Sequence, residues 1–363
     1  MSQYDVPVLW SPDTRRHDPR GEVWVGVPTV GTETAARVDA ILEALSGTPG
    51  HRLVEVGPTS SYVTEMLLEV HTAELVEFLR TAAARWAEGP YEALVGQDRV
   101  VPYLFPTPAM TAGLPAQPAA AVHAEAGRFG YDTMTLVGPG TWEAALAAAD
   151  CAVAAAGLVA GGEVLAYALC RPPGHHATPA GYGGSCYLNN AAVAAATLRD
   201  AGYARVGIVD VDAHHGNGTA AIFYARGDVL YGSVHVDPAH GWFPHVVGHA
   251  SETGTGAGEG STRNLPLPPG TGDEEWLAAV SALASWVVSS GCDALVVSLG
   301  VDAAVDDPES PLQITVPGYR EAGSLLGRTG LPAVVVQEGG YHLPTLGPLV
   351  AAYLGGHAEG AGP

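Results

Sequence analysis

The chain has no lysine, and basic residues as a whole are scarce. Its 363 residues include 16 basic residues, all of them arginine, against 38 aspartates and glutamates, so the formal net charge is −22 at pH 7. An average surface of this sign repels phosphate backbones and anionic lipid headgroups and attracts cations. Nucleic acid and membranes are therefore not expected partners, although an acidic surface can also serve only to keep a protein in solution.

Cysteines and long apolar runs are also rare. The four cysteines, Cys151, Cys170, Cys186 and Cys292, form no Cys-x-x-Cys pair, and a chain of this length needs no disulfides, so we expect reduced thiols. No window of about 18 uninterrupted apolar residues occurs, and the first residues lack the basic and apolar segments of a secretion signal. These absences predict a soluble, cytoplasmic protein.

Short apolar runs alternate with helical segments in the second half of the chain. Hydrophobic residues make up 47% of the sequence and charged residues 15%, which suits a large buried core. The runs rich in Val and Ile span residues 164–170, 205–211, 229–236, 294–299 and 333–337, and the helical segments span 141–158, 190–201, 273–289 and 319–329. This alternation predicts an α/β fold with a mainly parallel sheet covered by helices on both faces.

The first 135 residues are less regular. Helical periodicity occurs at residues 32–45 and 73–85, and the proline-containing segment 86–135 is predicted to be a long loop region. A long loop inside a compact domain is usually functional or disordered. No linker-like stretch or internal repeat interrupts the chain, so we predict that residues 1–363 form one domain.

Chemically active side chains follow four of the predicted strands. His175 and His176 follow the first, residues 210–215 follow the second, and Asp302 and Tyr341 follow the last two. In parallel α/β sheets, ligands bind beyond the carboxyl ends of the strands. The four strand ends therefore predict one shared site.

The segment after the second of these strands has the residue types of a metal site. Alternation along an extended chain places Asp210, Asp212 and His214 on one side. Carboxylate oxygens and an imidazole nitrogen are suitable ligands for a divalent metal, and Asp302 supplies a third strong ligand from another strand end. The alternatives are a hydrogen-bonded turn without metal and, for Asp302, a helix cap.

The other two strand ends supply groups for proton transfer and hydrogen bonding. The adjacent His175 and His176, in Arg171-Pro-Pro-Gly-His-His-Ala177, suit a general base and an electrostatic partner. In Gln337-Glu-Gly-Gly-Tyr341 the glycines permit a close backbone approach, and the tyrosine hydroxyl can donate to a developing oxyanion. Considered singly, the histidines could be surface residues and the tyrosine a packing residue.

Together these segments resemble the signature of the histone deacetylase family. The matching segments are Arg171–Ala177, Asp210–Thr219, Leu299–Asp302 and Glu338–Tyr341. Similarity to the branch of bacterial acetylpolyamine amidohydrolases is found in Pro139–Ala145, Phe243–His245, Glu252–Gly254 and Asn264–Leu267. The resemblance implies a single-domain arginase/deacetylase-like fold, with an eight-stranded parallel sheet flanked by helices and a tunnel to one zinc ion.

The same resemblance implies roles for individual residues. Asp212, His214 and Asp302 would bind zinc. His176 would act as general base and then as general acid, taking a proton from the metal-activated water. Tyr341 would polarise the acetyl carbonyl and stabilise the tetrahedral oxyanion.

Further residues of the resembled site have supporting roles. His175, paired with Asp210, would remain mainly an electrostatic helper. Asn217 stands where some relatives have an aspartate behind the second histidine, which would leave His176 less strongly held as a cation. A structural potassium ion would be bound by Asp210, Ser233 and the backbone carbonyls of Asp212, His214 and Val234.

The number and identity of the metal ions can be considered from the ligands. The related arginases bind two manganese ions with additional carboxylates, where this chain has Gly216 and Ala304. We therefore expect one metal ion. Two carboxylates and one imidazole also suit Fe²⁺, Co²⁺ or Mn²⁺, which remain alternatives to Zn²⁺.

The resemblance also suggests residues that contact the substrate. Gly184, Ser185 and Phe243 would line the tunnel, and Ser185 stands where relatives have a second aromatic ring, so bulkier acyl-amines would fit. Glu309 would favour a cationic amine at the tunnel mouth, with an ordinary surface glutamate as the alternative. Glu125 lies near the position of acidic residues that bind polyamines in the resembled branch.

These inferences predict a metal-dependent amidohydrolase that removes acetyl groups from small acetylated amines, with acetylpolyamines favoured. Acetyl-lysine proteins or peptides and acylated natural-product intermediates are the alternative substrates. A non-catalytic module that binds acetylated ligands is disfavoured, because the ligands, the base and the tyrosine are all present. The 86–135 region is expected near the active-site entrance and, as in the resembled branch, at the interface of a homodimer.

Overall fold

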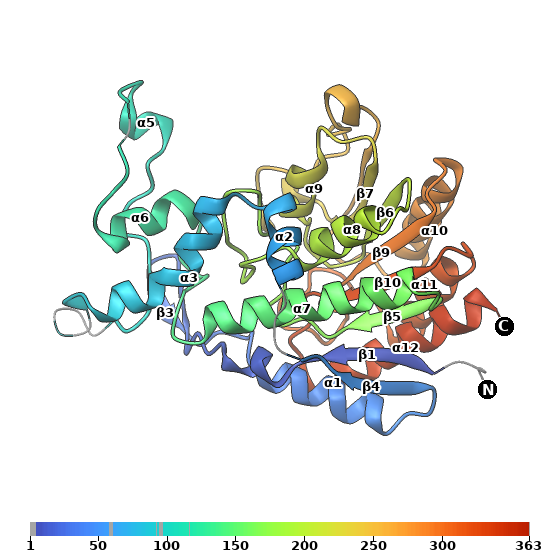
Figure 1. Cartoon of the computed structure of the whole chain (residues 1–363). Helices are drawn as coiled ribbons and strands as arrows, with labels where there is room; N and C mark the ends of the chain where they lie inside the picture. The colour runs from blue at the N-terminus through green and yellow to red at the C-terminus, as the bar shows by residue number, and fades with distance from the viewer. Residues whose placement is uncertain (1–4, 58–60, 92, 94–96, 116, 363) are drawn as a thin grey trace.

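The computed structural model describes residues 5–57, 61–91, 93, 97–115 and 117–362. In these residues an eight-stranded sheet lies between two layers of helices (Figure 1). Neighbouring strands are parallel throughout, in the order β4-β1-β5-β10-β9-β6-β7-β8. The strands are β1 (Val6–Trp10), β4 (His51–Glu55), β5 (Leu165–Ala168), β6 (Val206–Asp210), β7 (Val229–Val236), β8 (Thr262–Leu267), β9 (Ala294–Leu299) and β10 (Ala333–Gln337). The predicted fold class is confirmed.

Alternation along the strands creates two hydrophobic cores. In β10, Val334 and Val336 point into one core and Val335 points into the other. The first core is covered by α2 (Ser61–Val70), α3 (Ala73–Ala87), α6 (Val122–Phe129), α7 (Thr141–Ala160), α8 (Asn190–Asp200) and α9 (Asn217–Phe223). The second is covered by α1 (Ala36–Ser46), α10 (Asp273–Ser289), α11 (Val316–Gly327) and α12 (Leu343–Ala361). With both faces covered, the central strands are buried, which explains their nearly continuous apolar sequences.

Helix α7 is the described helix whose length and composition would also suit a membrane span. In the structure, 61% of that segment is buried. Its small alanine side chains pack against β5 and α8 in the first core. This is the environment of a core helix.

The strands that the sequence pattern misses lie at or near the two ends of the sheet. β7, β9 and β10 have the predicted bounds, and β5 and β6 are shorter by one or two residues at each end. β4 and β8 are the edge strands, and β1 is next to β4. The edge strands are only partly buried and therefore lack a continuous Val/Ile run. The sequence pattern also does not indicate α12.

The 86–135 region contains more regular structure than the predicted long loop. It includes the short helix α5 (Pro108–Thr111) as well as α6, and Figure 1 shows it projecting from the body as an arm. Residues 92, 94–96 and 116 of this region lie outside the described residues. A two-stranded antiparallel hairpin, β2 (Glu22–Trp24) and β3 (Val27–Thr29), lies apart from the main sheet.

Candidate active site

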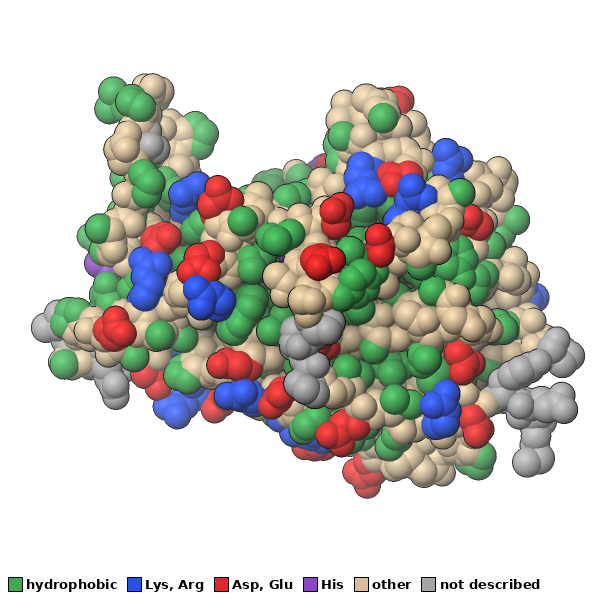
Figure 2. Space-filling model, viewed as in Figure 1, with side chains coloured by type: hydrophobic (Ala, Val, Ile, Leu, Met, Phe, Trp, Pro, Cys, Tyr) green, Lys and Arg blue, Asp and Glu red, His purple; other side chains and the backbone are tan. Residues whose placement is uncertain are grey.

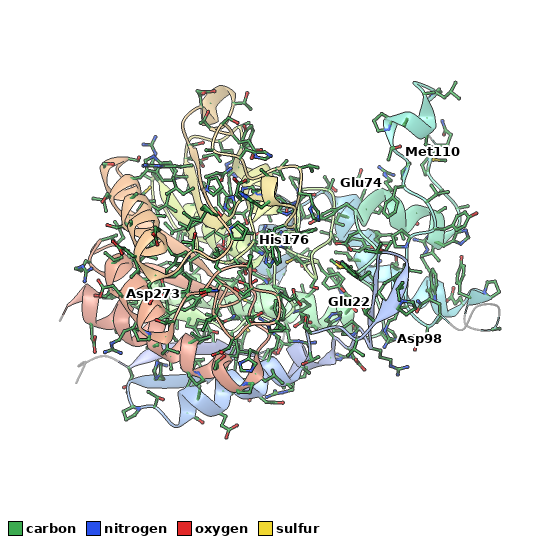
Figure 3. All side chains as sticks on the ribbon, turned by 180° about the vertical axis from the view of Figure 1, so that it is seen from behind. Glu22, Glu74, Asp98, Met110, His176 and Asp273 are labelled. Atoms are coloured by element: carbon green, nitrogen blue, oxygen red, sulfur yellow. The ribbon has the colours of Figure 1, made fainter. Side chains whose placement is uncertain are left out.

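The four strand ends singled out in the sequence are neighbours in the sheet. β5, β10, β9 and β6 are consecutive strands, and all run in the same direction. The segments that leave their carboxyl ends carry His176, Tyr341, Asp302 and Asp212. Figure 3 shows His176 near the middle of the molecule. Tertiary structure therefore brings the predicted site residues to one place.

Asp212, His214 and Asp302 form a compact group of metal-ligand type. One ligand atom of each lies within 4.8 Å of the others, and His214 Nδ1 is 3.0 Å from Asp302 Oδ2 and 3.4 Å from Asp212 Oδ1. Backbone amides orient the carboxylates: Ala213 N–H donates to Asp302 Oδ1 at 2.8 Å, and Gly339 N–H donates to Asp212 Oδ2 at 3.0 Å. The side chains are thus held in place by the loops that follow β6 and β10.

The electrostatics of this group are those of a cation site. Burial, with the charge of Asp212 added to it, raises the pKa of Asp302 to about 7. Burial opposes a charge on His214, but hydrogen bonds and charges of both carboxylates outweigh it and raise its pKa well above the usual value. Buried carboxylates this close either keep a proton on one of them or bind a cation between them. Two carboxylates and one imidazole therefore fit a divalent metal.

Two glycines make room for these carboxylates. A Cβ atom on Gly300 would lie 1.9 Å from Asp212 Oδ2, and one on Gly339 would lie 2.5 Å from Asp302 Oδ2. Both distances are far below a van der Waals contact. The glycines in the Leu-Gly-Val-Asp and Glu-Gly-Gly-Tyr segments are therefore required by the close approach of the backbone to the ligands.

His175 is held between carboxylates. Its Nδ1 lies 3.1 Å from Asp210 Oδ2, which also accepts a hydrogen bond from the Tyr231 hydroxyl at 2.9 Å. Burial disfavours the imidazolium, but the charges of Asp212 and Asp210 outweigh burial and raise the pKa of His175 to about 10. Its backbone N–H donates to the buried Glu338 carboxylate at 3.1 Å. This environment suits an imidazolium that contributes charge.

His176 has the opposite environment. Burial and the neighbouring His175 lower its pKa well below the usual value. Its Nδ1 is 2.7 Å from Asn217 Oδ1, and since an amide oxygen only accepts, Nδ1 carries the hydrogen and Nε2 keeps its lone pair. The Tyr131 hydroxyl donates to the His176 carbonyl at 2.9 Å and accepts from Asn217 Nδ2 at 3.5 Å, which orients the amide. His176 is thus a neutral base of defined tautomer.

A cavity of about 630 Å³ opens onto these groups. His176, His214 and Tyr341 lie on its wall with Gly184, Ser185, Phe243 and Glu309, so four of the five predicted substrate-binding residues lie together. The Phe243 ring packs edge-on against His176 at 4.7 Å between centroids. Gly184 and Ser185 both have positive φ, 57° and 60°, and Ser185 N–H donates to Thr135 Oγ1 at 2.9 Å.

Glu125 is not brought to this cavity. It lies on α6, forms an ion pair with Arg85 of α3, and lines separate surface hollows under the arm. Within this chain the structure therefore does not support the predicted contact of Glu125 with substrate.

The predicted potassium ligands are also adjacent. Asp210 of β6 stands opposite Ser233 of β7 in the parallel register, with Val234 next along β7. The Ser233 hydroxyl oxygen is 2.7 Å from His235 Nδ1. Since His235 Nε2 faces the Gly248 carbonyl at 2.8 Å and must donate to it, Nδ1 accepts the hydrogen of the Ser233 hydroxyl.

Several residues of the site escaped the sequence reasoning. Glu22 and Trp24 of β2 line the same cavity as Glu309, and Figure 3 shows Glu22 on the hairpin. Tyr131 supports His176, and Asp307 binds the backbone of Tyr341. Glu22, Trp24 and Tyr131 do not belong to a segment that follows a predicted strand. Asp307 is five residues beyond Asp302 in such a segment. The proximity to Asp302 was the one available signal.

Comparisons with known proteins agree with the fold and the site. Residues 31–356 match the histone deacetylase domain. The acetylpolyamine amidohydrolase of Mycoplana ramosa is 39% identical over 351 residues, covering 97% of this chain and 99% of that protein. The acetylpolyamine amidohydrolase of Burkholderia pseudomallei is 39% identical over 348 residues, covering 95% and 96%.

Solved structures show the same relationship. A crystal structure of the acetylpolyamine aminohydrolase from Burkholderia pseudomallei superposes with a TM-score of 0.89 at 37% identity, covering 98% of this chain and 99% of that chain. The HD domain of HDA15 gives a TM-score of 0.79 at 27% identity, covering 99% and 90%. The chain belongs to the histone deacetylase family, and the deacetylase class predicted from its motifs is confirmed.

Proposed function

We propose that this protein is a metal-dependent deacetylase of small acetylated amines that carry a positive charge, with acetylated polyamines as the substrate class. The observation that carries the proposal is one cavity lined by His214 of the metal-ligand triad, by His176 and Tyr341, and by two carboxylates, Glu22 and Glu309. Relatives that are 39% identical are named acetylpolyamine amidohydrolases.

Asp212, His214 and Asp302 would hold the divalent ion. Zinc is our proposal, and Fe²⁺, Co²⁺ and Mn²⁺ are the alternatives that the same ligands accept. When bound, such an ion acidifies water and polarises a carbonyl. Elemental analysis of protein purified without added metal identifies the ion, and a ratio of two ions per chain would contradict a mononuclear site.

His176 is proposed to move the proton. Its Nε2 lone pair is free because Asn217 accepts from Nδ1–H, so Nε2 can take a proton from the attacking water and return it to the departing amine nitrogen. The low pKa that burial and His175 impose keeps the ring neutral before the reaction. His175 is proposed to remain charged and to compensate negative charge at Asp210 and Asp212.

Tyr341 is proposed to donate a hydrogen bond from its phenolic hydroxyl to the carbonyl oxygen as negative charge develops there. The ring lines the cavity, and the Arg37 guanidinium lies 5.0 Å from the ring centroid. Burial and the negative charge of Glu309 raise the pKa of Tyr341 well above its usual value, so the hydroxyl keeps its hydrogen. A preorganised donor of this type contributes on the order of 10²–10³ in kcat.

Glu22 and Glu309 are proposed to select a cationic substrate. Burial and, second to it, the charge of nearby Glu309 raise the pKa of Glu22 to about 7. Among the described residues neither forms an ion pair with arginine, and Glu309 accepts a hydrogen bond from the Thr32 hydroxyl. An ammonium group between them would relieve the repulsion, by roughly 1–3 kcal/mol depending on solvent.

A comparison of matched substrates tests this proposal. N-acetylputrescine and N-butylacetamide have similar length, and only the first has an ammonium group. We expect kcat/KM to be at least about tenfold higher for N-acetylputrescine, and Glu309→Gln and Glu22→Gln to reduce this ratio. Glu74→Gln, at an exposed position of α3, is the control and should leave the ratio unchanged.

The outcomes separate the parts of the proposal. If neither acetamide is hydrolysed with the metal bound, the proposed deacetylation of small acetylated amines is contradicted. A preference for an acetyl-lysine peptide would replace the substrate class and leave the deacetylase. Hydrolysis of both compounds at equal rates would leave the enzyme and exclude charge selection by the glutamates.

A structural potassium ion is proposed beside the site. Asp210, Ser233 and the carbonyls of Asp212, His214 and Val234 are the proposed ligands. The pairing of Asp210 with Ser233 in the parallel register supports it, since it brings together oxygen atoms, the ligand type that hard cations prefer.

A homodimer is proposed through the projecting arm. Tyr103, Met110 and Leu114 of the arm are 79%, 59% and 74% exposed, and Figure 2 shows apolar side chains at its tip. Such a patch is costly to leave in water. Sedimentation at micromolar concentration tests the dimer.

A cytoplasmic location is likewise proposed. All four cysteines are buried and free, as in a reducing compartment.

A further inference from the structure

Asp307 connects two walls of the cavity. It lies in the segment that follows β9 and is 8% exposed. Its Oδ2 accepts hydrogen bonds from the backbone N–H groups of Tyr341, at 2.6 Å, and His342, at 3.1 Å. Its Oδ1 accepts from the N–H of Glu309, at 3.1 Å. One carboxylate thus binds the backbone at Tyr341, the proposed oxyanion donor, and the backbone at Glu309, on the wall of the cavity.

Tyr341 needs such an anchor because of its position in the chain. It follows Gly339 and Gly340 between the end of β10 and the start of α12, and Gly340 has a φ of 124°. Two glycines leave the backbone many accessible conformations. Among the described residues, no hydrogen bond holds the Tyr341 hydroxyl itself. Arg37 holds part of this segment, because its Nε donates to the Gly340 carbonyl at 2.6 Å and its guanidinium lies 5.0 Å from the Tyr341 ring centroid. Asp307 holds the other part, because it accepts from the Tyr341 N–H itself, so the place of the hydroxyl depends on both side chains.

We propose that Asp307 is a positioning residue, which fixes the backbone at Tyr341 so that the phenol points to the reacting carbonyl. The inference rests on the proposed function, in which Tyr341 donates to the oxyanion. Asp307 does not line the cavity and makes its bonds to backbone groups, so it acts through Tyr341. It also ties the donor to the segment of Glu309, so both move as one unit.

The size of the effect follows from the geometry. A displacement of about 1 Å of a catalytic group costs up to about 10² in rate, and loss of an oxyanion donor costs about 10²–10³. Asp307→Ala removes all three bonds, so we expect kcat to fall about 10- to 100-fold with KM within about threefold. Asp307→Asn keeps an oxygen for Tyr341 and His342 but turns an amide towards the Glu309 N–H. We expect this variant to recover much of kcat.

The decisive experiment combines these variants with Tyr341→Phe, in the metal-loaded enzyme with N-acetylputrescine. If Asp307 acts through the phenol, Asp307→Ala reduces kcat in the wild type and has little further effect in Tyr341→Phe, because the group that it positions is gone. Asp306→Ala, the same change at the exposed neighbouring residue, should have no effect. Equal losses from Asp307→Ala in both backgrounds would overturn the proposal, as would normal kcat in Asp307→Ala.

A second measurement does not depend on turnover. Hydrogen exchange followed by mass spectrometry on the peptide around residues 338–343 reports on the amides that Asp307 binds. We expect faster exchange there in Asp307→Ala, with the thermal midpoint and metal content near those of wild type, and no change in Asp306→Ala. Unchanged exchange would overturn the positioning role. This outcome can be read even if wild type hydrolyses none of the acetylated amines tested, so failure of the positioning role and failure of the proposed function can be told apart.

Discussion

Asn217→Asp would place a full negative charge behind the proposed general base. Asn217 Oδ1 is 2.7 Å from His176 Nδ1, so the new carboxylate would contact the ring directly. A carboxylate stabilises the imidazolium, and the pKa of His176 therefore rises. Only the neutral ring accepts a proton, so the acidic limb of the kcat/KM profile moves to higher pH.

The magnitude follows from the separation of the charges. Two unit charges about 4 Å apart interact by about 4 kcal/mol at an effective dielectric constant of 20. Burying the new carboxylate offsets part of this, and we take about 1.4 kcal/mol as the minimum that remains, a factor of ten in proton affinity. The limb should therefore move by at least about one pH unit.

The assay is kcat/KM for N-acetylputrescine across the pH range in the metal-saturated enzyme. Well above the limb, Asn217→Asp should approach wild-type activity, because the neutral ring is intact, and this separates the charge effect from structural damage. Asn217→Ala is the matched control, since it removes the amide without adding a charge, and its limb should not move upwards. The reasoning is refuted if the limb of Asn217→Asp stays at the wild-type pH, or if Asn217→Ala moves by the same amount.

Two further predictions concern catalysis and stability. Tyr341→Phe should lower kcat on the order of 10²–10³-fold with metal content unchanged, and wild-type turnover by this variant would exclude the phenol as oxyanion donor. Neutral His71 faces the Thr178 carbonyl with Nδ1 at 3.0 Å, and its Nε2 accepts from Asn189 N–H at 2.9 Å. Burial lowers its pKa from 6.5 to about 4, so its contribution is intact above pH 6.5 and is lost as the pH falls towards 4. A pKa shift from 6.5 to about 4 corresponds to about 3 kcal/mol of unfolding free energy. Between neutral pH and pH 4, the free energy of unfolding measured in urea should therefore fall by about 3 kcal/mol less in His71→Gln than in wild type. An equal fall in both proteins would contradict this assignment.

The central sheet was predictable because its strands are buried on both faces. The bounds of β9 and β10 follow directly from continuous apolar runs, which no solvent-facing position interrupts. β4 and β8 have one covered side and one free edge, so their sequences mix polar and apolar residues and resemble loops. The helix–loop arm at 86–135 was hard to predict for the same reason, because few of its positions are buried.

The sequence by itself determined the fold class, and it predicted the metal-ligand triad, His176 and Tyr341 as members of one site. Their signals are local, since each stands within a few residues of the carboxyl end of a strand and parallel strands share one such edge. Only the tertiary structure decided which other residues line the cavity or form hydrogen bonds with these site residues. Glu22 reaches the cavity from a hairpin more than 150 residues before His176, and Asp307 binds Tyr341 across 34 residues. Glu125 pairs with Arg85 instead of facing the cavity. Such contacts depend on how separate loops pack together, and no periodicity within one segment records that packing.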